Sequence, residues 1–218
     1  MTTIGWWDAD DAGTITATGS DVTQLDDKSG AGMHFTAPGG QELVTGSRSL
    51  NGRNGLYNDG NAYMAKSSFT IPASGDVMFV GVCEIDATDN SNDSLWSIEG
   101  GNDWQFAAGD STFDGNLICS FADTLSPIGG PFAGPSVYCN VFEFGVGKSI
   151  YVDGSLVGSD SDYSTKMNLS GLLQLFANRA GNQIPEGVFY ELVICEAVDD
   201  ATRTRLETYY SRKWGISL

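Results

Sequence analysis

The sequence predicts an all-β sandwich or jelly roll of two antiparallel sheets that ends in one α-helix. Of 218 residues, 28 are glycine and only 18% are charged, a composition typical of short strands joined by tight turns. Short apolar segments recur at roughly 10-residue spacing, and only one segment shows helical periodicity. No repeat period or linker divides the chain. We therefore expect a single domain, with a turn-rich segment over residues 1–37, a sandwich over 38–197 and a helix over 199–214.

The first 37 residues contain turn signals and only short apolar stretches. Ile15, Val22 and Leu25 are isolated apolar positions. Gly30 and Gly32 follow Lys28 closely, and glycine takes the positive φ values that tight turns need.

The strongest strand signal covers residues 76–86. Both alternating faces of this segment are largely apolar, which predicts a central strand covered on both sides. Residues 149–158 predict a hairpin, with Asp153 and Gly154 as a two-residue type I′ turn.

The predicted helix has recognisable ends. Asp199 or Asp200 can cap its first turn and face the positive end of the helix dipole. Gly215 can take the left-handed conformation that ends a helix. One apolar stripe follows the i, i+3, i+4, i+8 pattern: Leu206, Tyr209, Tyr210 and Trp214.

The charge and the hydropathy pattern exclude several functions. The net charge of −17 repels phosphate backbones and anionic membranes, so neither nucleic acid nor membrane is an expected partner. The longest apolar run, residues 77–83, is far shorter than the roughly 20 residues that span a bilayer. The first residues lack the features of a signal peptide, and we expect synthesis in the cytosol.

The four cysteines are widely spaced: Cys83, Cys119, Cys139 and Cys195. We expect small buried side chains in strands, made in a reducing compartment. A zinc site or a disulfide is the alternative, although the spacing supports neither.

Several stretches together resemble the concanavalin A-like, laminin G-like (LamG) jelly-roll domains of tailed-phage virion proteins and bacterial surface proteins. The family often has tryptophan at the position of Leu25. The stretches that carry the resemblance are Trp7-Asp-Ala-Asp10, Thr14-Ile-Thr16, residues 25–34, Asn51-Gly-Arg53, residues 56–60, Ile150-Tyr-Val-Asp-Gly154, Tyr190-Glu-Leu-Val-Ile194 and residues 205–216. The resemblance implies structural roles for Trp7, Asp8, Asp27, Lys28, Ser29, Gly30, Leu206, Tyr209, Tyr210, Trp214 and Gly215.

The resemblance also implies a class of function. Its main expectation is a non-enzymatic bacteriophage virion protein: a capsid decoration subunit, or part of a fibre or tail appendage. Such a protein would be a homo-oligomer bound to other virion proteins and located in the virion. A shared sandwich does not by itself select a function, so a module that binds a host surface polysaccharide is the alternative.

A glycan site would need an exposed aromatic ring beside polar side chains. Trp96 and Trp104 flank a polar stretch that includes Asn102 and Asp103, and a tryptophan there could stack on a sugar ring. The other interpretation is that both tryptophans are core residues of the sandwich.

A glycoside hydrolase is the second alternative. Glu84, Asp86 and Asp89 resemble the E-x-D-x-x-E pattern of glucanases in this fold class, since two-residue spacing places Glu84 and Asp86 on one strand face. The same residues also fit a strand that runs into a solvated turn. His34 is the only histidine, and no G-x-S-x-G motif accompanies it. We therefore expect no catalytic residues.

No cofactor is expected, although calcium is the ion that the loops suit best. Oxygen donors gather in residues 86–93, 58–61 and 159–162, and calcium prefers oxygen ligands. None of these stretches has EF-hand spacing, and Asx turns explain them without a metal.

The helix is expected to be a landmark of the fold and not the ligand site. Its apolar stripe would pack on the sandwich against Trp6 and Trp7, and so join the N-terminal segment to the C-terminal one.

Overall fold

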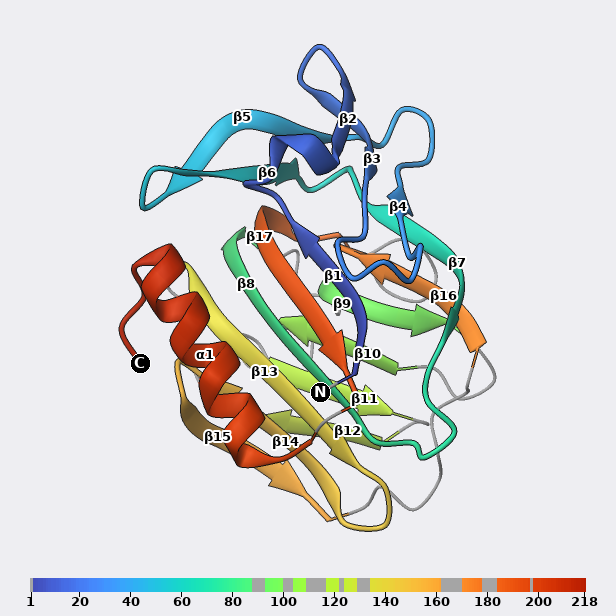
Figure 1. Ribbon diagram of the computed structural model, residues 1–218, viewed down its shortest axis with the longest axis vertical. Coiled ribbons are helices and arrows are strands. Elements are labelled where there is room, and N and C mark those ends of the chain that lie inside the picture. The colour runs from blue at the N-terminus through green and yellow to red at the C-terminus, as the bar shows by residue number, and fades with distance from the viewer. Residues whose placement is uncertain are drawn as a thin grey trace.

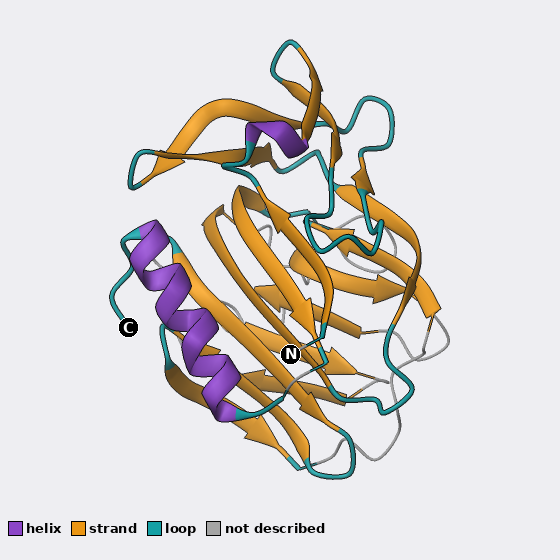
Figure 2. Ribbon diagram, in the orientation of Figure 1, coloured by secondary structure: helices purple, strands orange, loops and turns teal. Residues whose placement is uncertain are grey.

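The protein is a two-layered antiparallel β-sandwich with one α-helix packed on the outside of one layer (Figures 1 and 2). The computed structural model describes residues 2–87, 93–99, 104–108, 117–121, 124–128, 134–161, 170–177, 184–196 and 198–218. The predicted jelly-roll sandwich with a C-terminal helix is confirmed.

The first layer, which carries the helix, runs in the order β15-β14-β13-β8-β17-β1. All of its pairings are antiparallel. Its strands are β1 (Thr3–Asp8), β8 (Val77–Ala87), β13 (Ser136–Glu143), β14 (Gly147–Val152), β15 (Ser155–Asp160) and β17 (Glu186–Cys195).

The second layer runs in the order β12-β11-β10-β9-β16-β7-β4 and is also antiparallel. Its strands are β4 (Phe35–Thr36), β7 (Met64–Thr70), β9 (Asp93–Glu99), β10 (Trp104–Ala108), β11 (Leu117–Phe121), β12 (Thr124–Ile128) and β16 (Ser170–Leu175).

Four short strands connect the two layers at one end of the sandwich, at the top of Figure 1. They are β2 (Ile15–Thr18), β3 (Asp21–Leu25), β5 (Leu43–Leu50) and β6 (Arg53–Asp59), and a 3₁₀ turn, η1 (Ala12–Thr14), precedes them. The hairpin β5–β6 pairs with the first residues of β17, next to β1. Its tip, Asn51 and Gly52, has positive φ at both residues, as a type I′ turn requires.

Strand β8 is central and covered on both sides, as its sequence predicts. Val77, Phe79 and Cys83 face the core between the layers, whereas Met78 and Val80 face a second core beneath the helix. Cys83, Cys139 and Cys195 form no disulfide with one another and are buried in strands, which confirms their predicted burial. Cys119 lies in β11, where only its backbone is described.

The predicted hairpin around Asp153 is also confirmed. It joins β14 to β15, and Asp153 and Gly154 have φ values of 47° and 76°. A type I′ turn needs φ > 0 at both central residues.

Strand β1 was not expected in the N-terminal segment, where the sequence indicates turns. Trp6, Trp7 and Asp8 lie opposite Val193, Leu192 and Glu191 of β17. The β1 ladder thus ties the start of the chain to the strand that leads into the helix.

Helix α1 spans Asp200–Trp214, and both of its predicted ends are confirmed. The Asp199 side chain accepts a hydrogen bond from the Thr202 amide, and Gly215 ends the helix in the left-handed conformation at φ 73°. Among the described residues, no helix is long and apolar enough to cross a membrane.

The buried face of α1 is rotated from the predicted stripe. Tyr210 and Trp214 are fully buried and Leu206 is half-buried, but Tyr209 is 42% exposed. Arg203 and Glu207 occupy the buried side instead, joined by an ion pair of 2.7 Å. The burial predicted for Tyr209 is therefore wrong. The Arg203–Glu207 pair, whose two charges offset each other, occupies the buried side where an apolar residue was expected.

Candidate functional site

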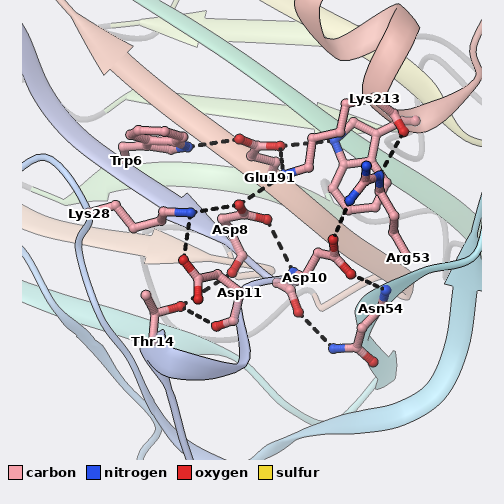
Figure 3. Close-up of polar contacts among 12 residues, drawn as sticks. Trp6, Asp8, Asp10, Asp11, Thr14, Lys28, Arg53, Asn54, Glu191 and Lys213 are labelled. Atoms are coloured by element: carbon pink, nitrogen blue, oxygen red, sulfur yellow. Dashed lines mark hydrogen bonds and ion pairs between the residues drawn. The ribbon is translucent and has the colours of Figure 1, made fainter.

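A buried carboxylate joins the N-terminal strand to the C-terminal helix. Glu191 on β17 is fully buried. It accepts the indole N–H groups of Trp6 (2.8 Å) and Trp214 (3.0 Å) and pairs with the Lys213 ammonium at 2.7 Å. The predicted link between Trp6 and the helix therefore exists, and it runs through this carboxylate (Figure 3).

Two lysines extend this network to the motif around Trp7. Lys213 also pairs with Asp8 at 2.8 Å, and Lys28 pairs with Asp8 at 2.9 Å and with Asp11 at 2.7 Å. We call Trp6, Asp8, Lys28, Glu191, Lys213 and Trp214 the Glu191 cluster. Its carboxylates are each opposed by an ammonium group, which burial requires.

The pKa values within the cluster follow from burial and from the ion pairs. Burial raises the pKa of the Glu191 carboxyl, and the nearby Asp8 charge adds to this effect. Burial alone would lower the pKa of Lys213, but its bonds to Asp8 and Glu191 raise it. For Lys28 the bonds to Asp11 and Asp8 likewise outweigh burial and raise the pKa to about 12.

The other residues of the N-terminal motif have structural contacts. The Asp27 carboxylate accepts the Trp6, Ser29 and Met33 amides and the Ser29 hydroxyl at 2.8–3.1 Å. Burial opposes ionisation, but these bonds lower the pKa of Asp27. Gly30 has φ 86°. The Trp7 ring is fully buried and packs against Phe35 at 4.6 Å. It lies in the core between the layers, whereas Trp214 lies in the core beneath the helix, so the predicted packing of the helix against Trp7 is wrong.

The tip of the β5–β6 hairpin closes the C-terminal end of helix α1. Asn51 and Arg53 both donate to the Lys213 carbonyl, at 3.1 and 3.0 Å. This carbonyl belongs to the last turn of the helix, whose carbonyl groups lack partners within the helix. Arg53 also pairs with Asp10 at 2.7 Å, so the hairpin, the helix and the turn that follows β1 are held together.

An open hollow of about 670 Å³ lies between the hairpin and the outer side of α1. We call it the helix hollow. It is lined by Arg53, Thr204, Arg205, Thr208, Tyr209, Arg212 and Lys213. Four of the eleven basic residues of the chain therefore line it, and its lining includes no acidic residue.

The cations of the helix hollow fall into two pairs. Arg53 and Lys213 are engaged by Asp10, Asp8 and Glu191. Arg205 and Arg212 are exposed, and neither forms an ion pair with any carboxylate in the described part of the chain. Among the residues that the structure describes, Arg205 donates to the Thr202 hydroxyl alone, at 3.1 Å, one turn earlier in the helix.

An aromatic ring lies between the two free guanidinium groups along the helix. Arg205, Tyr209 and Arg212 follow the spacing i, i+4, i+7, which places them in one row. The Tyr209 ring is 42% exposed. The hollow thus offers a ring face, two hydroxyl groups from Thr204 and Thr208, and two arginines that no described carboxylate pairs with.

The glycan site expected from the sequence does not form around Trp96. The Trp96 ring is fully buried, stacks on Phe106 at 5.1 Å and donates to the Asn140 side chain at 3.1 Å. It cannot stack on a sugar that approaches from solvent, so the core interpretation is correct for Trp96. Asn102 and Asp103 lie outside the described residues. Trp104 belongs to β10, and only its backbone is described.

The carboxylates considered for hydrolysis are held by an arginine. Asp86 accepts two bonds from the Arg48 guanidinium, at 2.8 and 3.2 Å. Glu84 lies 3.3 Å from Arg48 and accepts the Tyr190 hydroxyl at 3.0 Å. Asp89, the third position of the motif, lies outside the described residues. His34 is at the surface, with its Nδ1 2.9 Å from Asp26.

The calcium candidates show turn geometry where they are described. The Asn58 side chain accepts the amides of Gly60 and Ala62, at 3.1 and 3.0 Å, which is an Asx-type turn. Residues 88–92 and 162 lie outside the described part of the chain. Within that part, no group of three or more His, Cys, Asp or Glu side chains is placed to hold a metal ion.

No protein-family model matches the chain, and no curated protein sequence matches it. Solved structures do match its fold. Domain 4 of an extracellular GH43 arabinanase from Geobacillus stearothermophilus, in complex with arabinotriose, superposes with a TM-score of 0.72 at 13% identity, covering 94% of this chain and 98% of that domain.

Two other solved structures are longer than this chain, and the match covers only part of each. The sialidase of Trypanosoma rangeli matches with a TM-score of 0.65 at 13% identity, over 99% of this chain and 33% of the sialidase. The botulinum neurotoxin serotype G binding domain matches at 0.66 and 13% identity, over 97% of this chain and 51% of that one. The chain thus spans about a third of the sialidase, and at these identities the likeness establishes the jelly-roll sandwich alone.

The helix hollow was not found from the sequence, although one signal was available. Arg205, Tyr209 and Arg212 share a helix face by their spacing alone. The apolar pattern assigned Tyr209 to the buried side. For this reason Arg205, Tyr209 and Arg212 were not identified from the sequence as one exposed row. Arg53 comes from a hairpin about 160 residues earlier, and no local pattern places it there.

Proposed function

We propose that this protein is a carbohydrate-binding module whose site is the helix hollow. The observation that carries the proposal is the half-exposed Tyr209 ring with hydrogen-bond donors on both sides, in a hollow of about 670 Å³. Ligand sites combine an apolar or aromatic surface with a few polar groups, and their volumes are about 300–1,000 Å³.

The chemistry of the hollow suits a sugar. A sugar ring has a face of C–H groups that can lie on an aromatic ring, and hydroxyl groups around its edge that need donors and acceptors. Tyr209 supplies the ring, and Thr204 and Thr208 supply hydroxyl groups. Support of a weaker kind comes from the fold, since one similar domain was solved with arabinotriose and a similar sialidase with sialic acid.

The test is a glycan array followed by titration calorimetry with the best binder. Tyr209→Ala should weaken binding by roughly tenfold or more, because it removes the aromatic surface. Tyr209→Phe keeps the ring and should retain most of the affinity. Absence of any saturable binding on a broad array would refute the proposal, as would equal affinity of Tyr209→Ala and the unchanged protein.

We propose further that binding is not coupled to hydrolysis. Glu84 and Asp86 both bind the single Arg48 guanidinium, whereas a retaining hydrolase needs one carboxyl group to donate a proton and the other to attack the sugar. Reducing-sugar release from the bound glycan should be at background level. A hydrolase activity that Glu84→Gln abolishes would contradict this.

The virion role remains a prediction that rests on the resemblance to LamG-like phage domains. The virion role and the carbohydrate-binding role are compatible. Both would hold for a homo-oligomeric subunit that sits on a capsid or tail and binds a cell-surface polysaccharide. Mass spectrometry of purified virions tests the virion role, because absence of this protein from them would refute it.

A further inference from the structure

The helix hollow is an exception to the charge of the molecule. The chain carries 28 acidic and 11 basic residues, yet four basic and no acidic residues line this one hollow. Most acidic groups near it are engaged: Asp8, Asp10 and Glu191 pair with Lys213 and Arg53 at the base of the hollow. The charge that remains on its outer side is positive.

Arg205 and Arg212 carry that charge, and neither is held in an ion pair within the described part of the chain. The contrast with Arg203 on the same helix is clear, because Arg203 is 13% exposed and pairs with Glu207 and Asp200. A planar guanidinium binds a carboxylate, sulfate or phosphate through two parallel hydrogen bonds. Each of the two unpaired arginines therefore offers a site for one acidic group.

The spacing of the row sets how those acidic groups would be arranged. With a rise of 1.5 Å per residue, Arg205 and Arg212 lie about 6 Å and about 4.5 Å from Tyr209 along the helix axis. An acidic group can thus bind on either side of a sugar ring that lies on Tyr209.

We infer that the helix hollow binds an acidic saccharide, with a sugar ring on Tyr209 and its carboxylate or sulfate groups on Arg205 and Arg212. This inference rests on the proposed function and adds the ligand class. The net charge of −17 opposes long polyanions through the field of the whole molecule. The ligand is therefore a short acidic oligosaccharide, or the acidic end of a longer neutral chain.

The experiment compares matched acidic and neutral sugars. Trigalacturonate and its methyl ester differ only in the charge of the carboxyl groups, and a sulfated trisaccharide with its desulfated form makes a second pair. We expect each acidic member to bind at least tenfold more tightly than its neutral partner. Preference for the carboxylated or the sulfated pair identifies the acidic group, and either result supports the inference.

Charge-matched variants locate the effect. Arg205→Gln and Arg212→Gln should each weaken binding of the acidic sugar by about tenfold, the effect of one charge-assisted hydrogen-bond pair. Lys66→Gln on β7 also removes one positive charge, but it lies outside the hollow, and it should leave the affinity unchanged. Melting curves of the three variants show whether each is folded.

The possible failures can be told apart. Equal binding of acidic and neutral sugars, with Tyr209→Ala defective and Arg205→Gln normal, overturns this inference and leaves the carbohydrate-binding proposal intact. Equal weakening by Lys66→Gln overturns it as well, because the effect would then be one of net charge. If none of the probes and no glycan on the array binds, both proposals fail.

Discussion

The two sides of helix α1 use the same residue types in opposite ways. Tyr210 is fully buried, whereas its neighbour Tyr209 is 42% exposed. Arg203 lies over the Tyr151 ring at 3.9 Å and pairs with Glu207. Arg205, two residues further along the helix, has no ion-pair partner among the described carboxylates. The inner side holds the helix on the sheet. The outer side presents Arg205 and the Tyr209 ring to solvent, while the Tyr209 hydroxyl still reaches the buried Glu191 carboxylate at 3.4 Å.

The comparison shows how a polar helix can be packed on a sheet. Arg203, Glu207, Tyr210 and Trp214 follow the spacing i, i+4, i+7, i+11, which is a regular buried stripe. Two of its four members are charged, and the ion pair between them makes their burial tolerable. Packing against β8 and β13 thus depends on side chains that satisfy each other.

The largest effect is expected on the inner side at Trp214. Trp214→Ala removes a fully buried indole that packs on Tyr190 at 5.1 Å and donates to Glu191. Truncation of a core aromatic costs about 3–5 kcal/mol, so the free energy of unfolding should fall by that amount in urea titrations. An unchanged denaturation midpoint would show that the helix does not stabilise the sandwich.

A slightly smaller loss is expected when the carboxylate of the Glu191 cluster is neutralised. Glu191→Gln leaves the Lys213 ammonium, which is 10% exposed, with Asp8 alone. Breaking a buried ion pair costs roughly 3–5 kcal/mol, and the remaining partner should limit the loss to about 3 kcal/mol. Glu196→Gln, at an exposed carboxylate just beyond β17, is the control and should change stability by less than about 0.5 kcal/mol. Equal losses in the two variants would mean that the cluster has no special role.

A third, pH-dependent effect tests the buried ion pair of the inner side. Burial raises the pKa of Glu207 above its ordinary value of 4.5. The folded state therefore binds a proton more tightly than the unfolded state, so this group stabilises the fold below pH 4.5 and loses that contribution as the pH rises through the folded pKa.

Glu207→Gln lacks this titration. Its free energy of unfolding should therefore rise relative to that of the unchanged protein between about pH 4 and pH 8. Urea titrations of both proteins across that range measure the difference. A constant difference over the whole range would contradict the raised pKa.

Much of the fold follows from local sequence patterns. The two apolar faces of residues 76–86, the Asp153-Gly154 turn and the capping residues of the helix predict elements that the structure contains. Each of these signals depends on residues that are neighbours in the chain. Local backbone preferences therefore determine whether the strand, the turn and the helix ends form.

The site could not be predicted in the same way, because distant residues decide it. Trp96 is buried because Asn140 and Phe106 meet its ring and its N–H group. Tyr209 is exposed because Tyr210, Trp214 and the Arg203–Glu207 pair occupy the side that faces the sheet. Hydrophobicity alone ranks a tyrosine as more buried than an ion pair, and so it predicts the wrong side.

The smallest effect is expected on the outer side at Arg205. Arg205→Gln removes an exposed guanidinium whose only described hydrogen bond is to the Thr202 hydroxyl at 3.1 Å, and such surface changes stay within about 0.5 kcal/mol. Arg203→Gln is the contrasting variant, since it leaves the buried Glu207 without its nearest cation and should cost about 2 kcal/mol more. The free energies of unfolding of the two variants, measured side by side at neutral pH, decide the comparison. If Arg205→Gln were as destabilising as Arg203→Gln, the outer side would be part of the packing, and its arginines would not be free to bind a ligand.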